Sequence, residues 1–285
     1  MTALQPSNVK AAMWMAGWLA AMLTMAVAGR ETARVLDVFQ VMELRSLLGF
    51  LMLYPLVHAA GGFSAMKSNN PWRHIWRNSV HYAAQYAWLL AITLIPLAQV
   101  VSIEFTMPIW TALLAVVFLR ERMNSWKIIA IILGLIGVFI IVRPTTGNIN
   151  TGQLISLAAA VGFAISVILI KALTRVDSVV RIIFWMLVIQ SAIGAIPAYI
   201  VWQPVPSSLW GWVIVVSFCG TFSHYCMARA MTHADATIVV PMDFLRVPLT
   251  AMVGWFVYAE VIDIYTAAGA ALILTGNLLN LKKPN

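Results

Sequence analysis

Residues 97–119 read LAQVVSIEFTMPIWTALLAVVFL, and residues 236–259 read ATIVVPMDFLRVPLTAMVGWFVYA. Each run is long enough to cross a bilayer as a helix, which needs about 20 mostly apolar residues. Each also carries one acid beside a phenylalanine, Glu104 or Asp243, a few residues before a proline. Two such runs, with an acid in matching surroundings, predict a membrane protein built from a repeated unit.

The composition of the whole chain agrees with a lipid environment. Of its 285 residues, 62% are hydrophobic and 10% are charged, whereas soluble globular proteins have about 45–50% apolar and about 25% charged residues. The net charge of +8 comes from basic residues scattered singly between apolar runs, which is not the clustered basic face that binds nucleic acid. We therefore expect the lipid bilayer as the solvent and no nucleic-acid partner.

The number of spans follows from breaking the chain at polar clusters and at proline or glycine. The ten apolar runs are 11–29, 40–60, 78–95, 97–119, 126–142, 152–174, 179–202, 208–232, 236–259 and 263–281. The first run resembles a signal peptide, but it is long enough to span the membrane, so we interpret it as the first helix. The sequence thus predicts an all-α membrane protein with ten transmembrane helices.

The orientation of the chain is predicted from its loop charges, because short cytoplasmic loops are enriched in Lys and Arg. With a cytoplasmic N-terminus, the inner segments hold Lys10, Lys67, Arg73, Arg77, Arg120, Arg122, Lys127, Lys171, Arg175, Arg181, Lys282 and Lys283. The outer segments hold only Arg30, Arg34 and Arg143. Both termini are therefore expected in the cytoplasm, which agrees with an even number of spans.

An internal repeat relates the two halves of the chain. The offset of 139 residues between Glu104 and Asp243 also superposes other pairs, among them Tyr86/Tyr225, Thr93/Thr232, Phe105/Phe244, Glu121/Glu260 and Gly137/Gly276. We predict a duplicated five-helix unit, residues 1–146 and 147–285. Because five is odd, the second copy is expected to be inverted, an arrangement that transporters use around a shared midplane site.

Residues 96–144 and 234–281 resemble the ends of two EamA repeats of the drug/metabolite transporter superfamily. The shared elements are an A-x-x-V stretch, a proline in mid-helix, a glutamate at the helix end and a glycine-spaced next helix. The second copy departs at its loop, where YAEVIDIYT replaces the basic LRERMNSWK. The resemblance implies transport of amino acids, S-adenosylmethionine, riboflavin or other small metabolites, and Arg45 matches an arginine common in this pattern.

The two acids are the first candidate site residues. Ionisable residues within spans usually face a cavity or a partner, because each costs about 2.5–3.5 kcal/mol on insertion. Glu104 and Asp243 are therefore expected to bind a substrate amine or to carry a proton. The alternative is structural ion pairing. Asp243 would then pair with Arg246, one turn later, and Glu104 with Arg45 or Arg229.

Residues that follow the acids are expected to line the same site. Thr111 and Thr250 lie seven residues after them, on the same helical face. Pro108 and Pro248 remove a mid-helix hydrogen bond, so we expect a hinge or a free carbonyl at membrane depth; a packing kink is the alternative. Arg45 is expected to gate the site or to pair with an acid, with a simple interfacial position as the alternative.

Polar and aromatic residues form a stripe on the third run: His81, Gln85 and Trp88. The eighth run carries a similar set: His224, Tyr225 and Arg229. Such stripes suit an amphipathic substrate that needs hydrogen bonds and stacking, with interhelical bonding as the alternative. Trp110, beside a proline, is a further candidate for stacking. No metal site is expected, because neither histidine has a second ligand at i+4 or a nearby thiolate.

Glycines mark the helices expected over 126–142 and 263–281. They are Gly134, Gly137, Gly269 and Gly276, and almost no polar residues accompany them. Small residues let helix backbones approach closely in membranes. We expect close helix packing there, away from substrate, and a structural role for Glu121 and Glu260 at the ends of the preceding helices.

Together these features favour a secondary transporter that moves a small amphipathic metabolite by alternating access. The P-loop pattern is absent, which leaves a proton gradient, the membrane potential or solute exchange as the drive. A membrane-embedded enzyme is disfavoured because G-x-S-x-G and H-E-x-x-H patterns are absent, and a channel gives less reason for duplicated acids. We expect no cofactor, a monomer or homodimer, and a bacterial inner membrane.

Overall fold

The computed structural model describes residues 8–107, 109–111, 113–114, 125–142, 150–173, 176–231, 233, 242–243 and 245–280. Every regular element in this part of the chain is a helix. The α-helices are α1 (Asn8–Ala33), α2 (Val38–Ala59), α3 (Pro71–Leu94), α4 (Leu97–Glu104), α6 (Ser125–Val142), α7 (Thr151–Leu173), α8 (Val179–Ile200), α9 (Trp210–Met231), α11 (Arg246–Tyr258) and α12 (Ile264–Asn280). Short 3-10 helices are η1 (Phe63–Met66) and η3 (Ser207–Leu209). The expected all-α class is confirmed.

Five of the described helices are long and apolar enough to cross a membrane. They cover Val9–Ala33, Val38–Ala59, Thr151–Ile170, Val179–Ile200 and Ser207–Met227. Two shorter apolar helices cover Ile131–Ile141 and Ile264–Leu279. Apolar helices of this length satisfy their own backbone hydrogen bonds, which is what the interior of a bilayer demands.

Polar side chains at the helix starts satisfy backbone N–H groups that have no partner within the helix. The carboxylate of Asp37 accepts a hydrogen bond of 2.8 Å from the Phe39 N–H at the start of α2. Ser178 accepts from the Arg181 N–H at the start of α8. Asp263 accepts from Tyr265 and Thr266 at the start of α12. Each cap lies in a short connection, so the boundaries between helices are local sequence features.

The chain forms two compact units, and each unit takes helices from both halves of the sequence. Unit 1 comprises Met1–Tyr82 and Leu169–Asp243, and unit 2 comprises Ala83–Ile168 and Phe244–Asn285. The division falls within α3 and α7. It therefore differs from the predicted repeat boundary at 146/147, which is a division of the sequence and stays a prediction.

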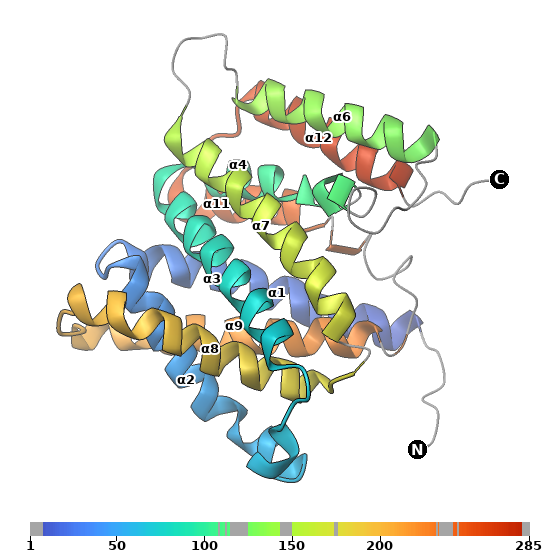
Figure 1. Ribbon diagram of the computed structural model, residues 1–285. Helices are drawn as coiled ribbons and strands as arrows, with labels where there is room; N and C mark the ends of the chain where they lie inside the picture. Colours follow the sequence, from blue (N-terminus) through green and yellow to red (C-terminus); the bar gives the residue numbers. More distant parts are fainter. Residues whose placement is uncertain are drawn as a thin grey trace. The chain divides into compact units, whose positions relative to one another are not determined.

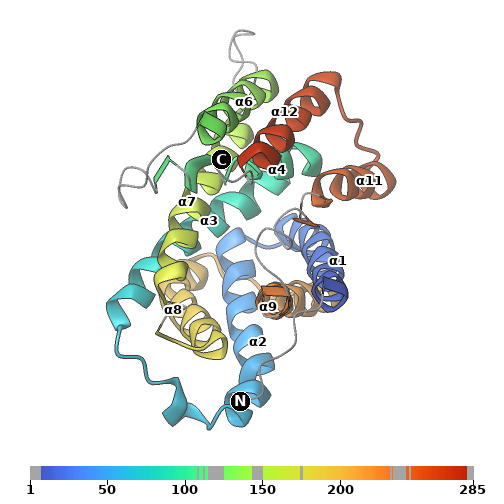
Figure 2. The ribbon, with the colours of Figure 1, turned by 90° about the vertical axis from the view of Figure 1, so that its right-hand side faces the viewer.

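Unit 1 is built around contacts of α9 with α1 and of α2 with α8 and α9 (Figure 2). Small residues allow these approaches. A side chain at Gly17 of α1 would lie 3.2 Å from the Cys226 sulfur, and one at Gly49 of α2 would lie 2.7 Å from the Thr221 hydroxyl. An apolar cluster joins α2 and η1 to α8, with buried residues Leu53, Val57, Met66, Phe184 and Leu187.

Unit 2 contains the close pair α6 and α12, which lie side by side in Figure 1. A Cβ at Gly137 would lie 2.7 Å from the carbonyl oxygen of Gly269, and a Cβ at Gly269 would lie 2.6 Å from that of Gly137. The expected close packing of these glycine-containing helices is confirmed for this pair. The helix α4 packs against α11 in the same unit.

The run 97–119, expected as one helix, is interrupted beside its acid. The helix α4 ends at Glu104, Phe105 and Thr106 form a turn, and Met107 is again helical. The Thr106 hydroxyl donates to the Ile103 carbonyl at 2.7 Å. A proline at position 108 has no N–H for the carbonyl four residues earlier, that of Glu104; Pro108 itself lies outside the described residues.

The second proline lies in a different position from the expected mid-helix one. The helix α11 begins at Arg246, so Pro248 belongs to its first turn. A proline there costs no intrahelical hydrogen bond, because the first N–H groups of a helix have no partner in any case. The expected loss of a mid-helix bond at Pro248 is therefore corrected, while its role as a hinge stays a prediction.

Candidate functional site

Unit 2 holds a buried carboxylate cluster of Trp88, Glu104 and Arg246. The Trp88 indole N–H donates to Glu104 Oε2 at 2.9 Å. Arg246 Nη2 donates to Glu104 Oε1 at 2.9 Å, which forms an ion pair between α11 and the end of α4. Three of the predicted site residues, from three helices, therefore meet at one carboxylate, which is 8% exposed.

The cluster is held by neighbours at the helix break. The Arg246 guanidinium carbon lies 4.9 Å from the centroid of the Phe105 ring, within the range of a cation–π contact. The Asn277 amide of α12 donates to the Phe105 carbonyl at 2.8 Å. A buried ion pair is stable only where further polar contacts complete it, and here an indole and an aromatic face supply them.

The ion pair of Arg246 with Glu104 is a contact that the sequence did not single out. From the sequence, the alternative partner of Arg246 is Asp243, one turn earlier on a continuous helix. Because α11 begins at Arg246, the described chain offers no continuous helix through both residues. The partner found is Glu104, 142 residues away in sequence.

Unit 1 holds the second acid in a similar setting. The Trp18 indole N–H donates to Asp243 Oδ1 at 2.7 Å. Nearby aromatic contacts include Trp14 edge-on to Tyr225 at 5.7 Å and the Arg229 guanidinium 5.5 Å from the Trp14 ring. Each acid of the predicted repeat thus accepts an indole N–H. Trp18 was not among the site residues expected from the sequence.

A further polar cluster lies inside unit 1. Gln190 of α8 donates to His81 Nδ1 at 2.9 Å, and the His81 and His224 rings are 5.9 Å apart. Arg45 of α2 and Arg77 of α3 are buried as well. Arg45 therefore lies inside the helix packing of unit 1, and both its gating role and an interfacial position stay predictions. Arg77 was counted among the inner loop charges, whereas the structure places it within α3.

A sequence signal for Arg77 does exist. The polar stripe on α3 continues towards its N-terminus from His81 through Asn78 and Arg77 to His74, all of them buried. These spacings of three, four and seven residues mark one helical face. The stripe was missed because the predicted span began at residue 78, which assigned the preceding residues to a loop.

The remaining predicted residues are placed as follows. Gln85 is buried, and its Oε1 has no hydrogen-bond partner among the residues described. Trp110 Nε1 donates to the Thr106 hydroxyl at 3.0 Å, and the Thr111 hydroxyl donates to the Met107 carbonyl at 2.9 Å. Thr250 is buried in α11. Trp110 and Thr111 thus bond to their own segment, and their substrate-binding role stays a prediction.

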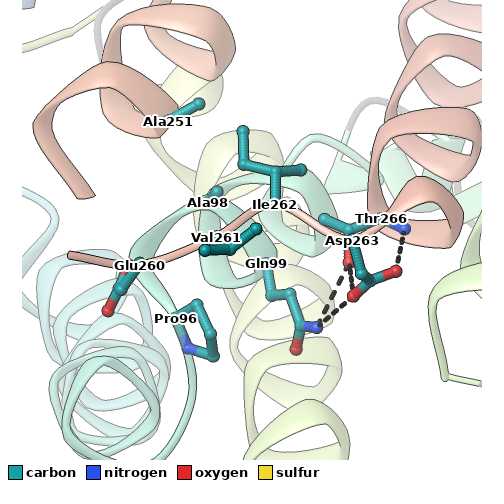
Figure 3. Close-up of a pocket in the computed structure, with 9 residues that line it drawn as sticks. All are labelled: Pro96, Ala98, Gln99, Ala251, Glu260, Val261, Ile262, Asp263 and Thr266. Carbon is teal, nitrogen blue, oxygen red and sulfur yellow. Dashed lines mark hydrogen bonds between the residues drawn. The ribbon is translucent and has the colours of Figure 1, made fainter. Parts of the chain in front are cut away.

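Glu260 lines a small pocket in unit 2 (Figure 3). Glu260 Oε2 accepts the Leu97 N–H at 3.0 Å, which satisfies a free donor at the start of α4. Gln99 donates to Asp263 at 3.4 Å and to Thr266 at 3.2 Å on the other side of the pocket. The contacts of Glu260 fit the structural role expected from the sequence.

Outside the spanning segments, Asp177 links two connections of unit 1. Its carboxylate accepts from Arg181 at 2.6 Å and from Ser68 at 2.8 Å, and it contacts His74 Nε2 at 2.9 Å. Arg181 also donates twice to the Ala65 carbonyl. Burial by itself raises the pKa of Asp177. Hydrogen bonds from Arg181, His74 and Ser68 lower the pKa by more than burial raises it, so the pKa lies below its ordinary value.

The Asp177→Asn variant is expected to be less stable than the wild type by about 1.5–3 kcal/mol, the range for hydrogen bonds to charged groups. A folded pKa below the unfolded one stabilises the protein fully above the unfolded value of about 3.9. The stability difference should therefore be constant above about pH 5 and shrink as the pH falls through the folded pKa. Thermal unfolding in detergent across pH measures it.

The matched control for Asp177 is Glu31→Gln, which removes an exposed ion pair with Arg34. Exposed pairs contribute about 0–1 kcal/mol, so this variant should unfold close to the wild type. Equal stability of Asp177→Asn and the wild type at neutral pH would contradict the assigned role.

Comparison with known proteins adds to this geometry. The sequence matches the EamA-like transporter family over residues 9–143 and again over residues 150–282. The S-adenosylmethionine uptake transporter of Rickettsia prowazekii (strain Madrid E) is 25% identical over 240 residues, 84% of this chain and 81% of that protein. The riboflavin transporter of Rhizobium johnstonii (strain DSM 114642 / LMG 32736 / 3841) is 28% identical over 236 residues, 82% and 78% of the two chains.

The pseudopaline exporter of Pseudomonas aeruginosa (strain UCBPP-PA14) is 26% identical over 253 residues, 86% of each chain. A crystal structure with 18% sequence identity covers 96% of this chain and 97% of its own, with a TM-score of 0.67, which shows a shared fold. The resemblance noted in residues 96–144 and 234–281 is thereby confirmed over nearly the whole chain. The protein belongs to the EamA-like transporter family and is an integral membrane transporter rather than an enzyme.

Proposed function

We propose that the protein is a secondary transporter that moves a small amphipathic organic metabolite by alternating access in a bacterial inner membrane. Its chain would form ten spans as two inverted five-helix repeats, with both termini in the cytoplasm. The observation that carries this proposal is the carboxylate of Glu104, buried beside a helix break and bound at once by Arg246 and Trp88.

The Glu104 cluster suits a switchable site. A substrate amine or a proton that binds Glu104 competes with Arg246 for the same carboxylate. Because this ion pair joins the end of α4 to the start of α11, loss of the pair would weaken the contact between these helices. Binding of a ligand to Glu104 and the arrangement of α4 and α11 are then coupled, because the Glu104–Arg246 ion pair is present in one state and absent in the other. A ligand can shift a conformational equilibrium only through such a difference between the two states.

The relatives support a metabolite as the substrate. Their names specify S-adenosylmethionine, riboflavin and pseudopaline, which are organic molecules with both polar and less polar parts. The buried indole of Trp88 beside the Glu104 carboxylate of unit 2 provides stacking surface and a hydrogen-bond donor for such a molecule. We propose an amino acid, or a related amine or vitamin, as the solute. One relative is named for uptake and another for export, so both directions belong in the test.

The test is reconstitution of the purified protein in liposomes with labelled amino acids, S-adenosylmethionine, riboflavin, nucleosides and polyamines. A thermal-shift screen of the same panel selects the solutes. Accumulation or counterflow of an intact solute, in either orientation of its gradient, supports the proposal. Flux of every stabilising solute at the rate of protein-free liposomes would contradict it.

For Trp88→Phe we expect a higher KM for aromatic solutes with a smaller change for aliphatic ones. Phenylalanine keeps an apolar ring but cannot donate to Glu104, and an aromatic pair contributes about 0.5–1.5 kcal/mol, which corresponds to a change of roughly threefold to tenfold. Trp88→Ala should raise KM further.

Trp76→Phe is the matched control for this variant, because Trp76 is largely exposed in the same helix, α3. Its KM should equal that of the wild type. If Trp88→Phe and Trp88→Ala also left KM unchanged for every solute, Trp88 would serve only to pack and to hold Glu104.

A further inference from the structure

Two buried arginines of unit 1 have unused hydrogen-bond donors. Arg45 is 6% exposed and Arg77 is 3% exposed. Among the residues that the structure describes, Arg45 Nε, Arg45 Nη1 and Arg77 Nε have no hydrogen-bond partner. Arg77 Nη1 donates to the Asn78 side chain at 2.6 Å, which is a neutral acceptor. Neither guanidinium therefore has a described carboxylate bound to it.

The surroundings of the two arginines carry an excess of positive charge. Arg77 lies one turn before His81 on α3, and Gly220, against which Arg45 packs, lies one turn before His224 on α9. The two imidazole rings are 5.9 Å apart, so both arginines lie on the same side of the cluster as these histidines. The acid on the same helix as Arg45 is Glu43, whose Oε1 accepts the Ser191 hydroxyl and whose Oε2 has no described partner. Among the residues that the structure describes, one glutamate accompanies two arginines in this cluster, so the described charges leave it net positive.

The backbone leaves space for these charged groups. A Cβ at Gly220 of α9 would lie 2.3 Å from Arg45 Nε, so only glycine allows the guanidinium to lie there. A Cβ at Gly194 of α8 would lie 2.7 Å from Glu43 Oε2. Buried charges are costly unless they are paired, yet the packing of α8 and α9 accommodates them. The unused N–H donors of the two guanidinium groups are of the kind that bind an anion.

We propose that Arg45 and Arg77 bind the oxyanion group of the transported solute, a carboxylate or a phosphate. Guanidinium groups match the oxygens of both groups with two parallel N–H donors, and the unused donors are of that kind. His81, His224 and Gln190 line the same cluster and supply hydrogen bonds for the remainder of the solute. This inference rests on the proposed transport function and narrows its substrate to anionic or zwitterionic metabolites.

The test measures anion binding directly, with succinate and inorganic phosphate as probes. Purified protein in nanodiscs of phosphatidylcholine is titrated with each salt at constant ionic strength, and its thermal unfolding is compared with a chloride titration. We expect saturable stabilisation of the wild type. In Arg45→Gln and Arg77→Gln the apparent Kd should rise at least about tenfold.

Nanodiscs with added phosphatidylglycerol distinguish binding of a lipid headgroup from binding of a free anion, because a headgroup would occupy the site and abolish the response to the added salt.

Matched variants keep the result interpretable. Arg34→Gln removes an exposed arginine of unit 1 that pairs with Glu31, and it should bind the anions as the wild type does. Arg45→Lys and Arg77→Lys keep the charge without the planar fork and should bind with intermediate affinity. If a glutamine variant fails to fold, the lysine variants carry the test. Equal Kd values in wild type, lysine and glutamine variants would overturn the proposal, as would stabilisation by chloride alone.

Failure of this inference can be told from failure of the transport function. Liposome flux of a solute without an acidic group, with unchanged KM in Arg45→Gln and Arg77→Gln, would overturn the anion site and leave the transporter intact. Anion stabilisation that needs both arginines, with no flux of any solute, would retain the site and reject transport as proposed.

Discussion

Replacing Glu104 by glutamine is expected to lower solute flux per folded protein at least about 100-fold. Glutamine can still accept the Trp88 N–H, but it carries no charge to oppose Arg246 or to bind a substrate amine or proton. A 100-fold loss corresponds to about 2.8 kcal/mol of lost binding or coupling free energy, because each 1.4 kcal/mol corresponds to a factor of ten. Counterflow in liposomes measures the loss, with protein amounts normalised to the folded fraction.

A double variant separates transport from stability at this site. Glu104→Gln alone leaves the Arg246 charge buried and should unfold earlier than the wild type. Glu104→Gln combined with Arg246→Gln removes both charges and should recover most of that stability, because neutral replacements of a buried pair are often tolerated. Its flux should stay low. Glu31→Gln, in an exposed pair, is the control and should transport normally.

Two results would remove Glu104 from the mechanism. One is wild-type flux in the Glu104→Gln variant across the whole pH range. The other is recovery of full flux in the double variant, which would show that the carboxylate serves only to neutralise Arg246.

Substitution of Gly137 by valine is expected to destabilise unit 2 by about 3 kcal/mol or more, at the upper end of the range for overpacking. The added Cβ would lie 2.7 Å from the Gly269 carbonyl oxygen, and backbone atoms cannot rotate away as a side chain can. The helices α6 and α12 would have to separate. Gly269→Ala meets the Gly137 carbonyl at 2.6 Å and should have the same effect. Denaturant unfolding in detergent measures both.

Gly211→Ala is the control in the same experiment, because it should not lower the stability. Nothing lies within 4 Å of a Cβ at Gly211 of α9, and alanine in a helix is favoured over glycine by about 0.5–1 kcal/mol. This variant should be as stable as the wild type or slightly more stable. Gly137→Val with wild-type stability would show that α6 and α12 do not approach as closely as described.

Part of the candidate site could be predicted from the sequence. Acids, prolines and a polar stripe stand out in an apolar chain, because each is costly in lipid and needs a reason. This logic located Glu104, Trp88, Arg246, His81 and His224, all of which lie in polar or aromatic clusters of the two units. It did not locate Trp18 or Arg77, because tryptophan is common in membrane helices and Arg77 lay just outside the predicted span.

The sequence by itself determined the all-helical class, the family and the close packing expected of the glycine-containing helices over 126–142 and 263–281, because hydropathy, motifs and glycine spacing are local properties of the chain. Only the tertiary structure decided that Arg246 pairs with Glu104, that Trp18 binds Asp243, and that Arg45 of α2 packs against Gly220 of α9. In a soluble protein a polar face shows which side of a helix points outward. Here lipid and protein core are both apolar, so the pattern does not record the rotation and depth of each helix. Those two quantities select which distant side chains meet.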